Sequence, residues 1–301
     1  MTDEDPLAIA AGIPLVAGYR GLVERLGGLT NRVYRLGGNC LRIPGKGTEE
    51  YINRANEAVA AREAAKAGVS PDVLYFDAGT GVMVTRFIDA AETMSPEKFK
   101  RRGGAPARAG QAFRKLHDSG AQFPFRFELF SMIDGYLKVL STKDVALPGG
   151  YHDVVREADQ SVRAALAAHA LPLTACHCDP LCENFLDTGD RMWIVDWEYS
   201  GMNDPMWDLG DLSVEAQFDE AQEEEMIRAY FDRAPSPAER GRIVIYKAMC
   251  DLLWTLWGLI QLANKNPADD FWAYANGRFV RCKAMMETAA FSNHVAAVAK
   301  G

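Results

Sequence analysis

Four polar residues within one short stretch of the chain have the types and spacing of a phosphoryl-transfer site. His177, Asp179 and Asn184 lie in a predicted turn, and Asp196 follows an apolar run that ends at Val195. Two carboxylates and an amide oxygen suit a hard cation such as Mg²⁺, which keeps room for phosphate oxygens. A carboxylate that does not bind the metal can accept the proton of a hydroxyl group. The set therefore provides a base, an amide ligand and a metal-binding aspartate.

A predicted β-hairpin must position these residues. Asn184-Phe185-Leu186 has the character of a short strand, Thr188-Gly189-Asp190 that of a turn, and residues 192–195 form a second apolar strand. The hairpin would bring Asp179, Asn184 and Asp196 close together. An Asp or Asn in a turn more often caps local backbone. Four matches at this spacing, with a strand leading to the last aspartate, favour the chemical interpretation.

The pattern H-x-D-x-x-x-x-N followed by D-W-E resembles the catalytic segment of the choline/ethanolamine kinase family. These enzymes are relatives of aminoglycoside phosphotransferases and, more distantly, of protein kinases. The resemblance extends from Gly27 to about Phe279 and is strongest over residues 176–215 and 250–262. It implies a two-lobed α+β fold of the protein kinase type. Residues 1–88 would form a small lobe with an antiparallel sheet and one principal helix, and residues 89–301 a larger, mostly helical lobe.

The same resemblance implies the activity and the roles of the catalytic residues. The chain would transfer the γ-phosphoryl group of ATP to the hydroxyl of choline. Asp179 would orient this hydroxyl and accept its proton, while Asn184 and Asp196 hold Mg²⁺. His177 would be a buried strut, and Asp208 would brace the catalytic loop. One departure concerns Cys178, which stands where many family members have Asn.

The small lobe supplies the predicted nucleotide-binding residues. In the segment GGLTNRVYRL (residues 27–36), glycine lets peptide N–H groups approach a phosphate. A Gly-Gly pair more often marks a plain turn, but the segment resembles the family's nucleotide loop. It is followed by strands predicted at 32–36, 40–43, 73–76 and 81–85, whereas residues 19–26 are predicted as a short helix or turn. The predicted nucleotide-binding residues are Gly28, Thr30, Asn31, Arg42, Glu57, Met83, Thr85 and Phe87.

Two groups within this set have distinct predicted tasks. Arg42 would neutralise phosphate charge, and its expected partner is Glu57 in the Ala-rich helix predicted for residues 51–67. The segment containing Met83, Thr85 and Phe87 would run from the sheet into the second lobe. By resemblance, its backbone would hydrogen-bond the purine and its apolar side chains would enclose the ring.

The remaining helices carry an aromatic pattern. Helices are predicted at 105–118, 127–140, 151–170, 220–232, 238–264 and 268–288. Trp254 and Trp257 are three residues apart and so share a helix face. Such a stripe is usually plain core, but rings can also enclose a quaternary ammonium by cation–π attraction. The resemblance supports this second interpretation and adds Tyr199, Glu215 and Tyr274 to the acceptor pocket.

Composition excludes several other classes of protein. The 301 residues are 48% hydrophobic and 25% charged, which is typical of a globular chain. A net charge of −8 argues against a nucleic-acid-binding face. The start is acidic and lacks the apolar core of a secretory signal, and the most apolar stretch, 248–263, is too short to span a membrane. Six cysteines are too few for a disulfide scaffold, and their spacing does not favour zinc, so we expect a cytoplasmic protein.

Three alternatives to a choline kinase stay open at this point. The acceptor could be ethanolamine or another small amino alcohol, but a primary ammonium needs hydrogen-bond acceptors more than ring faces. An aminoglycoside phosphotransferase would need an acidic cleft where this chain has tryptophans. A catalytically inactive, nucleotide-binding relative would not need Asp179, Asn184, Asp196 and Arg42 together. The sequence carries no information about oligomeric state.

Overall fold

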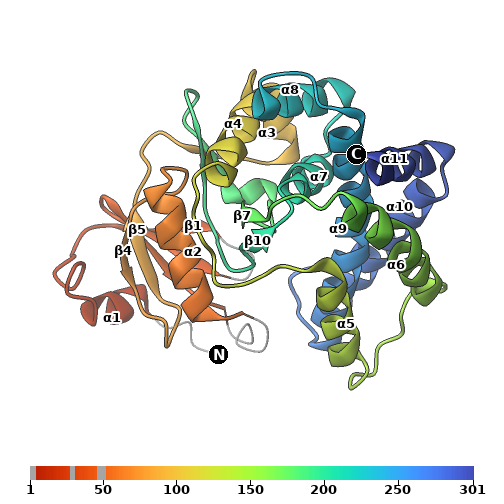
Figure 1. The fold of residues 1–301 in the computed structure, drawn as a ribbon. Coiled ribbons are helices and arrows are strands. Elements are labelled where there is room, and N and C mark those ends of the chain that lie inside the picture. The colour runs from red at the N-terminus through yellow and green to blue at the C-terminus, as the bar shows by residue number, and fades with distance from the viewer. Residues whose placement is uncertain (1–4, 28–30, 46–51) are drawn as a thin grey trace.

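The computed structural model describes residues 5–27, 31–45 and 52–301. These form a mixed α/β fold in which a small lobe with an antiparallel sheet lies beside a larger helical lobe, as the sequence predicted. Figure 1 shows the small lobe in red and orange and the helices of the large lobe mainly in green and blue.

The small lobe contains one five-stranded antiparallel sheet in the order β1-β2-β3-β5-β4. Its strands are β1 Val23–Gly27, β2 Arg32–Leu36, β3 Asn39–Ile43, β4 Val73–Phe76 and β5 Met83–Arg86. The prediction of a helix or turn at residues 19–26 is therefore wrong over β1. This edge strand is mostly exposed, so it carries no alternating apolar pattern, and its pairing with β2 decides its conformation.

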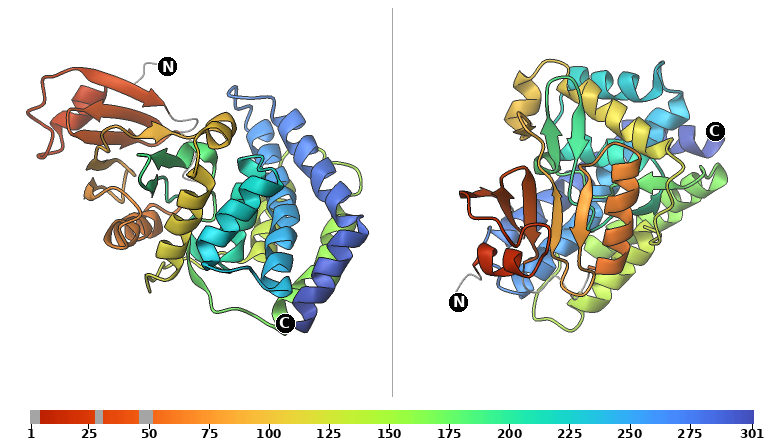
Figure 2. Two further views of the ribbon diagram at one scale, coloured as in Figure 1. Left: turned by 90° about the horizontal axis from the view of Figure 1, so that it is seen from above. Right: turned by 90° about the vertical axis from the view of Figure 1, so that its left-hand side faces the viewer.

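The two faces of this sheet have different neighbours. The helix α1 (Pro6–Ala11) and the turn after it cover one face, where Ile13 packs with Leu41 and Val84 in a separate apolar cluster. The other face carries Arg42 and Met83, which pair across β3 and β5. The helix α2 (Arg54–Lys66) belongs to this second side, because its buried alanines share the main core with Met83. Figure 2 shows α1 and α2 on opposite sides of the strands.

The large lobe is mostly helical, with short strands that carry the catalytic segment. Its helices are α3 Pro96–Arg101, α4 Ala105–His117, α5 Leu129–Leu140, α6 Tyr151–Ala168, α7 Met206–Glu215, α8 Glu220–Phe231, α9 Pro237–Ala263, α10 Phe271–Met286 and α11 Ala289–Lys300. Its strands are β6 Glu92–Thr93, β7 Thr174–Cys176, β8 Phe185–Asp187, β9 Met192–Ile194 and β10 Gly201–Asn203. The predicted helices correspond to α4, α5, α6, α8, α9 and α10, but α11 was not predicted.

The chain passes between the lobes just after the five-stranded sheet. This sheet ends at Arg86, and the next strand, β6, pairs with β8 of the large lobe. The crossing therefore occupies residues 87–91, next to the predicted lobe boundary at residue 88.

The long helix α9 organises the core of the large lobe. A capping box of Ser236 and Glu239 begins it, and α5, α7, α10 and α11 pack around it. The stretch 248–263 was expected to be too short to span a membrane, but it is part of this 27-residue helix, which is long and apolar enough to do so. However, 83% of the most apolar window of the helix is buried within the protein. Its hydrophobicity is therefore accounted for by packing against the neighbouring helices.

Substitution of Gly210 tests the close packing of α7 on α9. A methyl group at this position would lie 2.7 Å from the carbonyl oxygen of Ile243. We expect Gly210→Ala to destabilise the protein by about 1–3 kcal/mol, because the backbones must separate. Urea unfolding measures the change. Gly135→Ala is the matched control, since nothing lies within 4 Å of the added methyl group, and an unchanged midpoint for Gly210→Ala would contradict the packing argument.

Candidate active site

The predicted hairpin brings together the residues that were predicted to be catalytic. Strands β8 and β9 pair directly, with Phe185 opposite Ile194. The Asn184 side chain donates from Nδ2 to the carbonyl oxygen of Asp179 at 3.0 Å, and the Asn184 carbonyl accepts from the Val195 N–H at 2.9 Å. Asn184 and Asp196 therefore lie together at the open end of the hairpin, and Asp179 joins them through its carbonyl oxygen. The amide oxygen of Asn184 can then accept a cation.

The loop that carries Asp179 is held by one buried carboxylate. The oxygens of Asp208 accept hydrogen bonds from the peptide N–H groups of His177 and Cys178, each at 2.8 Å, and Oδ2 lies 3.0 Å from Nε2 of His117. Cys178 has a φ of 67°, a left-handed conformation that costs energy for a residue with a side chain. The two hydrogen bonds fix this bend immediately before Asp179. This agrees with the bracing role predicted for Asp208.

The side chains of His177 and Cys178 both point away from the chemistry. His177 is fully buried, and its Nε2 lies 2.9 Å from the carbonyl oxygen of Val195. Burial lowers the pKa of His177, which keeps the imidazole neutral and fits a strut better than an acid. The Cys178 thiol is also fully buried, 3.7 Å from the carbonyl of Cys176. A Cys in place of the usual Asn at position 178 therefore affects the packing beneath the loop. It does not change the surface that an acceptor molecule would contact.

A buried group of side chains around Asp208 has ligand atoms close enough together to bind a metal ion. His117, Cys176 and Asp208 have ligand atoms within 4.8 Å of one another and are all buried. The nitrogens of His117 already contact Asp208 and the hydroxyl of Tyr230. Burial raises the pKa of the Cys176 thiol well above its usual range, which disfavours the thiolate that a metal requires. Hydrogen bonding explains this group fully.

A buried ion-pair cluster connects the small lobe to the catalytic carboxylates. Arg42 forms the predicted salt bridge with Glu57, and its Nη1 also lies 3.4 Å from Asp196 and 3.5 Å from Glu198. Arg54 bridges Glu57 at 2.8 Å and Glu198 at 2.6 Å. Neither Arg54 nor Glu198 was predicted from the sequence to belong to the site. Two features of the sequence could have indicated them: Arg54 lies three residues before Glu57, and Glu198 is the glutamate of the D-W-E motif.

Negative charge is concentrated around the two catalytic aspartates. Burial and the carboxylates of Asp196, Glu215 and Glu198 raise the pKa of Asp179 well above its usual range. Burial and Glu198 raise the pKa of Asp196 to about 7, although Arg42 opposes the shift. Carboxylates with raised pKa values in one place gain energy from a cation. The donor set and its electrostatics therefore fit Mg²⁺.

The predicted phosphate loop is only partly within the described residues. Asn31 is buried, and its Nδ2 donates to Asp196 Oδ2 at 3.2 Å and to Glu198 Oε1 at 3.1 Å. It therefore reaches the predicted metal ligand directly, which the sequence did not indicate. Gly28 and Thr30 lie outside the described residues.

The residues predicted to hold the purine lie at the end of the sheet nearest the lobe crossing. Met83 and Thr85 share the sheet face of Arg42, because they pair with Arg42 and Cys40 of β3. The Arg86 N–H donates to the Asp72 carbonyl and the Phe87 N–H to the Gly38 carbonyl, both at 2.9 Å. The N–H groups of Arg86 and Phe87 are therefore already hydrogen-bonded within the small lobe. The backbone contact with a purine that was predicted for this segment stays a prediction.

The four predicted aromatic residues form one continuous cluster. The ring of Tyr199 lies 5.4 Å from that of Trp254, and the ring of Trp257 lies 5.7 Å from that of Tyr274. The Trp257 Nε1–H donates to the Tyr199 hydroxyl at 3.0 Å and joins the two pairs. Phe271 extends the cluster, with its ring 5.8 Å from that of Trp257. The rings of α9 therefore contact α10 through Trp257 and the segment after Asp196 through Trp254.

Glu215, the predicted anionic residue of this pocket, is paired with a cation of the protein itself. Arg278 on α10 forms a salt bridge with Glu215 and another with Asp251 at 3.2 Å. Its guanidinium also lies 4.6 Å from the centre of the Tyr274 ring. Arg281 pairs with Asp251 at 2.5 Å. Arg278 was not predicted from the sequence; its position four residues after Tyr274 places the two side chains on one face of α10 but does not indicate its ion pairs.

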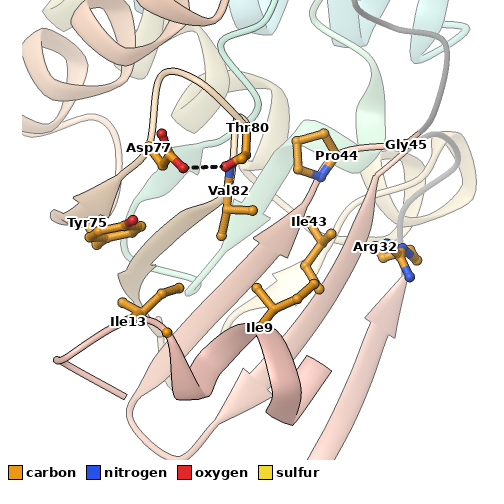
Figure 3. A pocket seen from close by; sticks show the side chains of 11 residues that line it. Ile9, Ile13, Arg32, Ile43, Pro44, Gly45, Tyr75, Asp77, Thr80 and Val82 are labelled. Atoms are coloured by element: carbon orange, nitrogen blue, oxygen red, sulfur yellow. Dashed lines mark hydrogen bonds between the residues drawn. The ribbon is translucent and has the colours of Figure 1, made fainter. Parts of the chain in front are cut away.

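A separate pocket of about 330 Å³ lies on the opposite face of the small sheet. Figure 3 shows Ile9 of α1 and Ile13 of the turn after it pointing towards Ile43 of β3 and Val82 just before β5. Arg42 points to the other face of β3, because side chains alternate along a strand. This pocket is therefore distinct from the predicted catalytic site.

Comparisons with known proteins place this geometry in a family. Residues 22–243 match the phosphotransferase enzyme family. A choline/ethanolamine kinase family protein from Mesorhizobium loti is 75% identical in sequence, with a TM-score of 0.92 and 98% of each chain covered. The chain belongs to the choline/ethanolamine kinase family. The choline kinase LicA from Streptococcus pneumoniae is 28% identical, with a TM-score of 0.77 over 93% of this chain and 98% of that one. LicA in complex with AMP matches with a TM-score of 0.73 and 28% identity over 89% and 91%.

Membership of the choline/ethanolamine kinase family confirms the class of chemistry predicted from the sequence. The chain is a small-molecule kinase that uses an alcohol group as acceptor. The segment with the H-x-D-x-x-x-x-N pattern lies inside the matched region and carries the carboxylates that crowd the cleft.

The brace of the catalytic loop in this kinase can be tested at Asp208. An amide nitrogen cannot accept a peptide N–H, so Asp208→Asn leaves a buried donor unpaired and costs about 1–3 kcal/mol of stability. We also expect turnover to fall more than tenfold at temperatures where the variant is folded, because the bend before Asp179 loses its support. Thermal unfolding and steady-state kinetics measure the two effects. Asp118→Asn, at an exposed pair with Arg114, is the control, and normal turnover in folded Asp208→Asn would contradict the bracing role.

Proposed function

We propose that this kinase transfers the γ-phosphoryl group of ATP to the hydroxyl of choline, which yields phosphocholine. The observation that carries the proposal is the aromatic cluster of Tyr199, Trp254, Trp257 and Tyr274 close to Asp179. Tyr199 follows Asp196 by three residues, and the charge of Asp179 contributes to the raised pKa of Tyr274. A trimethylammonium group gains about 0.5–2 kcal/mol from each ring that it faces. The hydroxyl at the other end of choline is then directed to the catalytic loop.

The catalytic roles follow from the environment of each side chain. Asp179 orients the acceptor hydroxyl and takes its proton, and its raised pKa suits it to general-base work near neutral pH. Asn184 and Asp196 are the residues that would hold Mg²⁺, which supplies positive charge to the phosphate oxygens. Arg42 faces the same region and is kept in place by Glu57. The complex of LicA with AMP supports an adenine nucleotide as donor.

Choline is favoured over ethanolamine because of what lines the pocket. A primary ammonium needs three hydrogen-bond acceptors, whereas a quaternary ammonium needs apolar and aromatic surface. The cluster offers the second kind of surface. All six cysteines of the chain are free thiols, which supports a cytoplasmic location for the reaction.

The first test is turnover with choline, ethanolamine and kanamycin side by side, with Mg²⁺ present and then chelated. We expect choline to be the preferred acceptor and all turnover to stop on chelation. In the same assay Asp179→Ala should reduce kcat by roughly 10²–10⁴-fold, the usual contribution of a general base. Nucleotide binding, followed by calorimetry, should persist. Near-normal turnover of Asp179→Ala would sink the assignment of the base, and kanamycin as the preferred acceptor would overturn the proposed substrate.

The aromatic cluster is tested by a pair of tryptophan variants. Trp257→Ala removes a half-buried ring of the cluster, and we expect the KM for choline to rise roughly tenfold or more while the KM for ATP stays constant. Trp272→Ala is the matched control on α10, because its side chain is 43% exposed. Equal effects of both variants on the choline KM would show that the ring is not part of an acceptor pocket.

A further inference from the structure

Asp211 is a buried carboxyl group of the acceptor region that forms no salt bridge within the described part of the chain. Glu215 pairs with Arg278, and Asp251 pairs with both Arg278 and Arg281. Asp211 on α7 is fully buried and forms no salt bridge with any of the described residues. It lies one helical turn before Glu215, so the two carboxylates share a face of α7. Glu215 and Asp251 each have an arginine partner, whereas Asp211 has no ion-pair partner among the described residues.

The hydrogen bonds of Asp211 connect it to the aromatic cluster. Its Oδ2 accepts the Nε1–H of Trp254 at 3.2 Å. Its Oδ1 is buried and has no hydrogen-bond partner within the described part of the chain. A buried carboxylate oxygen without a partner is costly, and such atoms in a folded protein call for an explanation. Binding of a positively charged ligand against the ring of Trp254 would explain the unpaired oxygen.

The electrostatic environment supports the same conclusion. Burial and the neighbouring charges of Glu215 and Asp179 raise the pKa of Asp211 well above its usual range, while Arg278 acts in the opposite direction. Arg278 is already shared between Glu215 and Asp251. A further cation next to Trp254 would stabilise the ionised form of Asp211 without competing for Arg278.

We infer that Asp211, and not Glu215, is the residue that makes the acceptor pocket selective for positive charge. Asp211 holds the Trp254 ring through its Nε1–H, and its carboxylate attracts a cation lying against that ring. The pocket therefore distinguishes a charged amino alcohol from a neutral alcohol of the same shape. This inference rests on the proposed function, because it concerns the specificity of the same site.

The test compares choline with 3,3-dimethylbutan-1-ol, in which carbon replaces the nitrogen and the charge is lost. Asp211→Asn keeps an oxygen that can accept from Trp254 and removes only the charge. We expect the choline KM to rise roughly tenfold or more, because a Coulomb attraction at close range is lost. The KM of the neutral alcohol should change less than about twofold, and kcat with choline less than about threefold, since the lost interaction is equal in ground and transition states.

Three controls keep the outcome interpretable. Asp153→Asn, on the exposed side of α6, should leave both acceptors unchanged. Asp211→Ser serves as a second neutral variant if Asp211→Asn folds poorly, because its hydroxyl can also accept from Trp254. The KM for ATP should be the same in every variant.

The outcomes separate the inference from the proposed function. A drop in the preference for choline over the neutral alcohol supports the role of Asp211. An unchanged preference in a folded variant, whether both acceptors weaken equally or neither weakens, overturns it and leaves choline kinase activity standing. A wild-type protein that phosphorylates neither acceptor overturns the proposed function and this inference together.

Discussion

Crowding of negative charge in a poorly solvated cleft is the constraint on which the rest of this structure depends. The proposed phosphoryl transfer requires Asp179 and Asp196 to lie close together, and burial makes their mutual repulsion expensive. Arg42 offsets part of this cost through ion pairs with Glu57 and Asp196. Arg42 belongs to the small lobe and Asp196 to the large one, so their ion pair also joins the two lobes.

One face of α7 serves the two halves of the active site. Asp208, Asp211 and Glu215 follow each other at intervals of three and four residues, so their side chains lie along one side of the helix. Asp208 holds the bend before the catalytic base, Asp211 holds Trp254, and Glu215 binds Arg278. The close packing of α7 on α9 therefore sets the distance between the catalytic loop and the aromatic cluster.

The sequence revealed the parts of the site that depend on local patterns. The hairpin between Asn184 and Asp196 followed from strand and turn composition, and the pairing of Arg42 with Glu57 followed from the resemblance to kinases. The strand β1 was missed because it is an exposed edge whose conformation comes from pairing with β2. Arg278 was missed because its partners, Glu215 and Asp251, lie on other helices and no short spacing connects them.

The sequence by itself determined the types of chemical group, their order along the chain and the family in which they occur. Local spacing sufficed for this, because a turn, a hairpin or a helix face is defined by neighbouring residues. Only the tertiary structure decided which charges are compensated. It paired Arg278 with Glu215 and left Asp211 beside Trp254 with no salt bridge among the described residues. Ion pairs between distant elements depend on how helices pack, and the energy of a buried charge depends on every neighbour around it.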